Sequence, residues 1–148
     1  MSVNVGNVSV GQIVAMSTIH VDRDQLRDYA NASGDLNPIH QDEEFARAVG
    51  LPDVIAHGMW TMGAAVEVVS QWAGDPTAVI SYSTRFTSPV PVPAEGGADI
   101  DVKASVKKVD TETGQVTVEL AVTCGDAKVL GRALAVVRTQ PTDGDSAT

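Results

Sequence analysis

The sequence predicts an α+β fold in which an antiparallel β-sheet wraps around one long apolar helix. One strand-like run and two short helical segments come first, an almost uncharged helical segment lies near the middle, and four β-like runs fill the second half. Strands that follow one another through short turns pair as antiparallel neighbours, and the apolar face of such a sheet is covered by a helix. At 148 residues the chain has the size of one domain, which we expect to span residues 1–148.

The first two elements are a strand over 12–20 and a helix directly after it. The stretch VDRDQLRDYANASG places Asp22 at the start of the helix and Gln25 three residues later, which is the spacing of a capping box. Gly34 follows the last helical residue and is a natural stop. The helix therefore ends where a loop rich in polar residues begins.

A second short helix is predicted in QDEEFARAVG. Asp42 can cap its start, and Gly50 can end it. Phe45, Ala46 and Val49 are the apolar residues of this segment, and we expect them to face inward. The residues between the two helices then form a loop.

The third helix, over about 56–72, differs from the first two because it is apolar or small all round. A helix of this kind is expected to be buried on every side. Its middle contains Gly63, Ala64 and Ala65, which let neighbouring backbone approach closely. Glu67 is the one carboxylate in the segment, and the sequence does not decide whether it faces a dimer interface or pairs with a neighbour.

Four β-like runs follow, over 78–86, 98–109, 115–124 and 128–139. Two of them alternate between apolar and polar residues, as a strand with one buried face does. The turns DTETG and CGDAK are short enough for hairpins. The positions expected to face the core are Ile100, Val102, Ala104, Val106, Val116, Val118, Leu120 and Val122.

Composition excludes several classes of protein. The net charge of −9 and the pI of about 4.5 disfavour nucleic acid as a partner, because phosphate binding needs concentrated Lys and Arg. Cys124 is the only cysteine, which excludes an intrachain disulfide. No signal peptide or apolar run of membrane-spanning length is visible, so we expect a cytoplasmic chain without membrane insertion. Residues 1–10 and 141–148 are expected to be flexible.

The stretch SGDLNPIH carries the first candidate site. Gly34 and Pro38 leave its backbone little freedom, so Asp35 and His40 can be held at a fixed separation. An ionised carboxylate and a neutral imidazole could together bind one water molecule and move protons near neutral pH. In an arbitrary protein the same pair more often stabilises a turn, and the residues alone leave both interpretations open.

The stretch VIAHGMW carries the second candidate site. Gly58 lies where the apolar helix should begin, and the unsatisfied amides of a helix N-terminus suit a carbonyl oxygen that becomes negative during a reaction. Glycine has no side chain to block that approach, although a packing role is equally open. His57 we interpret as structural, because His40 has the better-placed acid partner.

These stretches resemble one known family. YANASGDLNPIHQDEEFA, residues 29–46, is similar to the signature of the MaoC-like, (R)-specific hydratase/dehydratase family, and IAHGMWTMG and YSTRFTSPVPVP resemble later family segments in the same order. The resemblance implies a hot-dog fold, with Asp35 and His40 as the catalytic dyad and the Gly58 backbone amide in an oxyanion hole. Asn37 would orient the loop. Around VPAEGGADI the chain departs from the family's usual turn.

The resemblance also implies a reaction and partners. The expected activity is reversible dehydration of a (3R)-hydroxyacyl thioester carried by CoA or acyl carrier protein, without metal or organic cofactor, in an obligatory dimer of hot-dog folds. Within the family, residues 10–139 are most similar to the catalytic subunits of heterodimeric dehydratases of actinobacterial type II fatty acid synthesis, in the mycolic-acid pathway. A homodimeric enoyl-CoA hydratase, a hot-dog thioesterase and a non-catalytic acyl-binding subunit are the alternatives.

Overall fold

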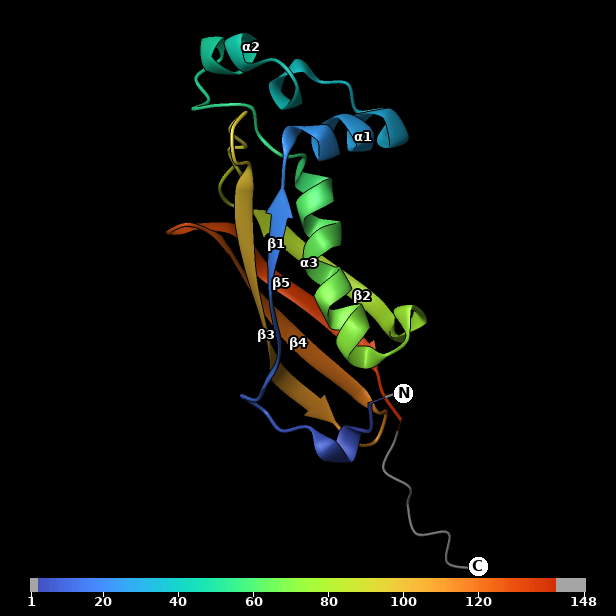
Figure 1. Cartoon of the computed structure of the whole chain (residues 1–148). Helices are drawn as coiled ribbons and strands as arrows, with labels where there is room; N and C mark the ends of the chain where they lie inside the picture. The colour runs from blue at the N-terminus through green and yellow to red at the C-terminus, as the bar shows by residue number, and fades with distance from the viewer. Residues whose placement is uncertain (1–2, 141–148) are drawn as a thin grey trace, which may run out of the picture.

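A computed structural model describes residues 3–140 and contains the predicted sheet and central helix (Figure 1). The sheet has five strands in the order β1-β3-β4-β5-β2, and every neighbouring pair is antiparallel. The strands are β1 (Ile13–Val21), β2 (Val79–Phe86), β3 (Ala98–Asp110), β4 (Gln115–Cys124) and β5 (Ala127–Arg138). Helix α3 (Gly58–Ala73) packs against the sheet. The predicted α+β architecture is therefore confirmed.

The core lies between α3 and the inner faces of β3, β4 and β5. All eight positions expected from the alternation in β3 and β4 are buried. Alanines at 133 and 135 of β5 and at 65 of α3 are buried with them, so the helix lies close to the sheet. Small side chains thus compensate for the scarcity of aromatic residues.

Helix α1 (Arg23–Ser33) begins and ends as its sequence predicts. The Asp22 carboxylate accepts from the Gln25 amide at 2.9 Å, and the Gln25 side chain accepts from the Asp22 amide at 2.8 Å. Gly34 closes the helix in the left-handed region, with φ 81°. The capping box and the glycine stop together fix where the candidate loop starts.

Helix α2 (Glu43–Ala48) differs from the prediction in the direction of its side chains. Ala46 is buried, but Phe45 and Val49 are 41% and 55% exposed. The physical reason is position, because α2 lies beyond the end of the sheet and its main contacts are with the 3-10 turn η2 (Pro38–His40) (Figure 1). The expectation that Phe45 and Val49 face the core was wrong.

Helix α3 is covered on one side only. Its buried residues are Thr61, Ala65, Val68, Val69 and Ala73. Met59, Gly63, Glu67 and Gln71 recur every fourth residue and form an exposed stripe, in which the Glu67 carboxylate accepts from Gln71 at 3.5 Å. The expectation of burial on all sides was wrong within this chain, because one sheet covers one side of a helix. Within residues 3–140 no helix has the length and apolar character of a membrane span.

The N-terminal segment is hydrogen-bonded to Gln140 near the other end of the described chain. The short turn η1 (Val5–Asn7) buries Val5, whose amide donates to the Gln140 carbonyl at 2.9 Å. The Gln140 amide donates in turn to Val3 at 2.9 Å. The flexibility expected of residues 1–10 stays a prediction, and these contacts show what residues 3–8 touch when they are in place. Residues 1–2 and 141–148 lie outside the described residues.

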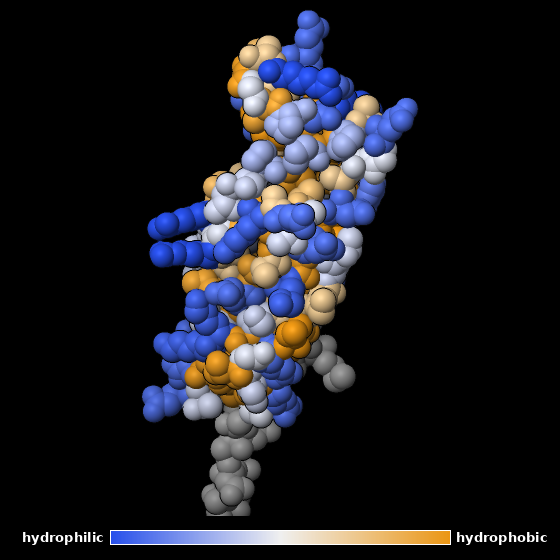
Figure 2. Space-filling model, turned by 90° about the vertical axis from the view of Figure 1, so that its left-hand side faces the viewer, coloured by the Kyte–Doolittle hydropathy of each residue, from blue (hydrophilic) through white to orange (hydrophobic). Residues whose placement is uncertain are grey.

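The outer surface of the sheet is largely polar. On the face seen in Figure 2, hydrophilic side chains cover much of the surface and hydrophobic residues gather in smaller patches between them. The pair between Lys107 and Glu119, at 3.0 Å, is an exposed cross-strand contact of this kind. Exposed pairs of opposite charge contribute little to stability. The polar side chains of this surface therefore interact mainly with water and add little to the free energy of unfolding.

Gly131 on β5 provides a test of packing near the strand end. A Cβ at this position would lie 2.7 Å from Cγ2 of Thr87, whose hydroxyl donates to the Lys128 carbonyl at 2.6 Å and so resists rotation. We expect Gly131→Ala to lower the free energy of unfolding by roughly 1–3 kcal/mol, the usual cost of overpacking. Adding Thr87→Ser, which removes only Cγ2, should restore most of it. Urea unfolding of both variants and of Thr87→Ser alone measures this, and an undiminished stability of Gly131→Ala contradicts it.

Candidate active site

The loop between α1 and α2 is held by hydrogen bonds from its own side chains. The Asp35 amide donates to the Ser33 hydroxyl at 3.1 Å, the Asn37 amide to Asp35 Oδ1 at 3.2 Å, and the Ile39 amide to Asn37 Oδ1 at 3.2 Å. Asn37 thereby caps the turn η2, at whose end His40 lies. Turns of this type restrict both the backbone and the Asp side chain. The loop therefore presents Asp35 Oδ2 and the His40 ring in fixed directions.

Asp35 and His40 face each other across a narrow gap. His40 Nδ1 lies 2.7 Å from the Ile55 carbonyl oxygen, which can only accept, so Nδ1 carries the proton of the neutral ring. The unprotonated Nε2 is then directed towards Asp35 Oδ2 at 3.9 Å. This separation is too long for a direct hydrogen bond, and a water oxygen that bridges the two atoms from one side can lie about 2.8 Å from each. His40 is 7% exposed, whereas the Asp35 side chain is half exposed.

His57 lies directly against this pair. Its ring stacks on His40 with the centroids 3.9 Å apart and the planes 24° apart, and Tyr29 packs on it at 4.8 Å. His57 Nε2 is 3.1 Å from the Asp35 carbonyl oxygen, while Nδ1 is buried with no hydrogen-bond partner in the described part of the chain. Burial lowers the pKa of His57, and the hydrogen bond to the Asp35 carbonyl opposes that effect only in part.

The N-terminus of α3 begins one residue after His57. No side chain caps this helix, and within residues 3–140 the Gly58 amide donates to no backbone or side-chain acceptor. A Cβ on Gly58 would lie 3.0 Å from the Phe86 ring, so a larger residue at this position would press on that ring. The site thus has a free amide at the positive end of a long helix.

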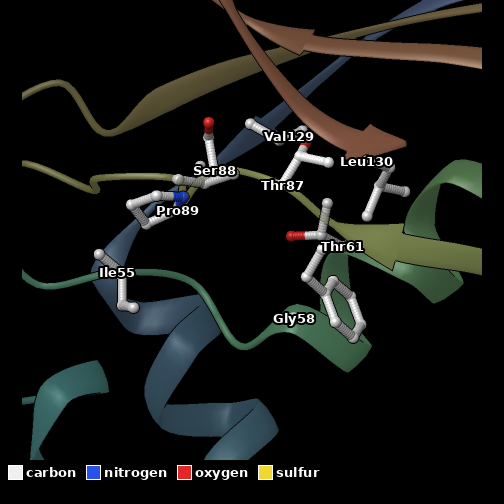
Figure 3. A pocket seen from close by; sticks show the side chains of 10 residues that line it. Ile55, Gly58, Thr61, Thr87, Ser88, Pro89, Val129 and Leu130 are labelled. Carbon is white, nitrogen blue, oxygen red and sulfur yellow. The ribbon is translucent and has the colours of Figure 1, made fainter.

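A cavity opens beside Gly58. It has a volume of about 300 Å³ and is lined mainly by apolar groups of α3, β2, β5 and the segment after β2. Figure 3 shows the Thr61 hydroxyl directed into it. Ile55, whose carbonyl holds His40, also lines the cavity. An apolar chain can occupy this space while a polar head group lies at the Gly58 amide.

Asp35, His40 and His57 do not suit a metal ion, although donor atoms of all three lie within 4.8 Å of one another. Metal ions bind in the plane of an imidazole, along the nitrogen lone pair. The nearly parallel, stacked rings direct their lone pairs side by side instead of towards one point. His40 Nδ1 and His57 Nε2 are in addition engaged by carbonyl groups.

The structure brings together all the residues singled out in the two sequence stretches. Asp35, Asn37 and His40 share one loop, and Gly58 follows His57, which touches both Asp35 and His40. The contact of His57 with both Asp35 and His40 was missed, because spacing in sequence does not show that residues 40 and 57 stack. Its place next to Gly58 was the only available signal.

His57 gives a pH dependence to the stability. Since its pKa is lower in the folded chain than the ordinary value of about 6.5, the unfolded chain binds this proton first as the pH falls. We therefore expect the free energy of unfolding to be at its full value above about pH 6.5 and to decrease below it. His57→Gln, which cannot bind this proton, should flatten the dependence below about pH 6.5. Urea unfolding across this range is the measurement, and equal slopes in the two proteins would contradict the prediction.

Comparison with known proteins identifies the family. The family model described as MaoC like domain matches residues 7–124, and the chain belongs to this family. The solved structure of a MaoC-like dehydratase superposes with a TM-score of 0.91 at 40% identity, over 94% of this chain and 43% of that one. The hot-dog fold expected from the sequence is thereby confirmed.

Relatives of known activity match different lengths of the chain. The 3-hydroxybutyryl-CoA dehydratase of Methylorubrum extorquens is 34% identical over 111 residues, which cover 74% of this chain and 68% of the relative. The 3-hydroxyacyl-thioester dehydratase X of Mycobacterium tuberculosis is 41% identical over 73 residues, which cover 49% of this chain and 25% of the relative. The chain spans a quarter or less of the length of the first curated relatives it matches.

Proposed function

We propose that the chain is a hydro-lyase that interconverts (3R)-hydroxyacyl thioesters and enoyl thioesters, with Asp35 and His40 as its catalytic dyad. The observation that carries this proposal is the 3.9 Å gap between Asp35 Oδ2 and His40 Nε2, two proton acceptors that face each other. A water molecule between them donates one hydrogen bond to each, which leaves an oxygen lone pair free to attack carbon. Related dehydratases in the same family support the reaction class.

In the hydration direction the water oxygen bonds to C3 of the enoyl thioester. One member of the dyad takes a proton from the water as this bond forms, and the pair returns a proton to C2, so the product is the substrate plus one water. Dehydration runs through the same steps in reverse. Asp35 Oδ2 and His40 Nε2, which face each other, share the two proton transfers.

The Gly58 amide stabilises the intermediate charge. As water adds to C3, negative charge develops on the thioester carbonyl oxygen, and a free amide at the N-terminus of α3 can donate to that oxygen. The Phe86 ring restricts space above Gly58 and keeps the thioester close to the amide. Asn37 orients the loop, because its side-chain oxygen accepts from the Ile39 amide and caps η2.

We further propose the setting of the reaction. The chain would act in the cytoplasm as the catalytic subunit of a hot-dog dimer, homodimeric or with a related non-catalytic subunit, on acyl-CoA or acyl carrier protein thioesters of type II fatty acid or mycolic-acid elongation. Large apolar side chains are exposed near the site, among them Leu36, Met59 and Phe86. Burying them against a second subunit would supply the hydrophobic gain that a stable dimer needs.

The test is a hydration assay on the purified chain, alone and mixed with candidate partner subunits. Crotonyl-CoA and longer enoyl thioesters on CoA and carrier protein are offered, and the hydroxyacyl product is analysed for chirality. We expect the (R) product and no release of free thiol. An (S) product would exclude the assignment, and thiol release without hydration would identify a thioesterase instead.

A further inference from the structure

The proposed chemistry leaves one titratable residue of the site without a task. His57 is 1% exposed and touches both members of the dyad, and one of its ring nitrogens lies within 4.8 Å of donor atoms of both. Its Nε2 is engaged by the Asp35 carbonyl, and its Nδ1 is buried. A direct exchange of protons with the reacting water is therefore not its role.

Packing alone does not account for a histidine at this position. Because the Asp35 carbonyl can only accept, Nε2 carries the proton and Nδ1 is left as an acceptor without a donor in residues 3–140. An apolar ring would fill the same space without leaving a buried acceptor unpaired. Histidine combines a flat ring with an N–H at the position of Nε2, and both features are in use here.

We propose that His57 is a positioning residue that sets the distance between Asp35 and His40. Its Nε2–H holds the backbone of residue 35 through the carbonyl, and its ring face holds the imidazole of residue 40 through the stack at 3.9 Å. The Ile55 carbonyl fixes only the in-plane direction of His40, so a second contact is needed to fix the ring against movement out of its plane. The proposal rests on the dyad chemistry proposed above.

The surroundings of His57 fit this passive role. The groups that face it are the Asp35 backbone and carboxylate, the His40 ring and the Tyr29 ring. Two stacked imidazoles repel each other when both are charged. A His57 that stays neutral therefore lets His40 gain and lose a proton during turnover.

The test compares two substitutions that each keep one feature of the histidine. His57→Phe keeps a flat ring on His40 and loses the N–H, whereas His57→Gln places its amide nitrogen near the position of Nε2 and keeps the donor. We expect kcat for crotonyl-CoA hydration to fall roughly 10- to 100-fold in His57→Phe with KM within about twofold, since misplacement by about 1 Å costs on that order. His57→Gln should recover several-fold of this loss.

Three further measurements make the result decisive. His20→Phe is the matched control, because His20 is exposed on β1 and pairs with Asp99 at 2.8 Å away from the loop; its kcat should equal that of the wild type. Thermal unfolding shows whether each variant is folded. Hydrogen exchange of the Asn37, Ile39 and His40 amides, measured without substrate, should be faster in His57→Phe than in the wild type and in His57→Gln.

The outcomes separate the two proposals. A folded His57→Phe with wild-type kcat and wild-type amide exchange overturns the positioning role, as does an equal loss of kcat in His20→Phe. A wild-type chain that hydrates no enoyl thioester in the assay above overturns the proposed function. In that case, faster amide exchange of the loop in His57→Phe still supports the positioning role of His57. Unchanged amide exchange would overturn the positioning role as well.

Discussion

Asp35→Asn and His40→Ala are each expected to reduce the rate of enoyl-thioester hydration by roughly 10²- to 10⁴-fold, the range that positioned acid–base groups contribute. Asn at position 35 keeps the oxygen that accepts from the Asn37 amide but cannot take a proton. Ala at position 40 removes Nε2 altogether. Steady-state kinetics with crotonyl-CoA, in the presence of any partner subunit that activity requires, measure the effect.

Both variants should remain folded, because the dyad lies outside the main core. His40→Gln, which avoids a cavity beside His57, provides a second measurement if His40→Ala is unstable. Asp42→Asn is the matched control, since it makes the same substitution on the same segment at a helix cap where Asn serves equally well. Near-normal turnover in both Asp35→Asn and His40→Gln would refute the assignment of the dyad.

Arg23→Ala is expected to have the largest effect on stability, a loss of about 2–4 kcal/mol in the free energy of unfolding. The Arg23 guanidinium donates to Asp53 at 2.6 Å, to Glu43 at 3.2 Å and to the Val92 carbonyl at 3.0 Å. It is mostly buried, as is Asp53, so its removal leaves an uncompensated carboxylate. A cation in the first turn of a helix also opposes the helix dipole, which indicates that the contacts outside α1 keep it there.

Arg27→Ala provides the control for this prediction. Arg27 lies one turn further along α1 and pairs with Asp24, but both side chains are exposed, so its loss should cost less than about 1 kcal/mol. Thermal unfolding should show a decrease in Tm of roughly 5–15 °C for Arg23→Ala and little change for Arg27→Ala. Equal decreases in the two variants would show that Arg23 acts only through its helix.

Local chemistry made the strands and helix ends predictable. The alternation in β3 and β4 placed eight residues correctly in the core, and Asp22, Gln25 and Gly34 marked both ends of α1. These signals depend only on neighbouring residues, because the period of a strand and the capping of a helix are local properties. The burial of Val5 depends on the distant residue Gln140 and had no local signal.

The direction in which side chains point was harder to predict than the position of helices and strands in the sequence. Phe45 and Val49 read as core residues because they are apolar, but the place of α2 beyond the sheet leaves nothing for them to pack against in this chain. The exposed stripe on α3 could not be predicted either, because the sequence of an apolar helix does not show which side of the helix faces the sheet. In the site, Asp35, His40 and Gly58 came from short motifs, whereas the contacts of Ile55 and His57 with the dyad required the fold.

The hydrogen bonds between Gln140 and residues 3 and 5 have a consequence for how this fold can be joined to other sequences. They bring both ends of the described chain together at the end of the sheet opposite to α1 and α2 (Figure 1). A sequence joined to residue 3 or to residue 140 would therefore begin at the end of the sheet opposite to the loop that carries Asp35 and His40. The same proximity favours circular permutation, in which a short linker joins residues 3 and 140 and new ends open in an exposed turn such as the one between β3 and β4.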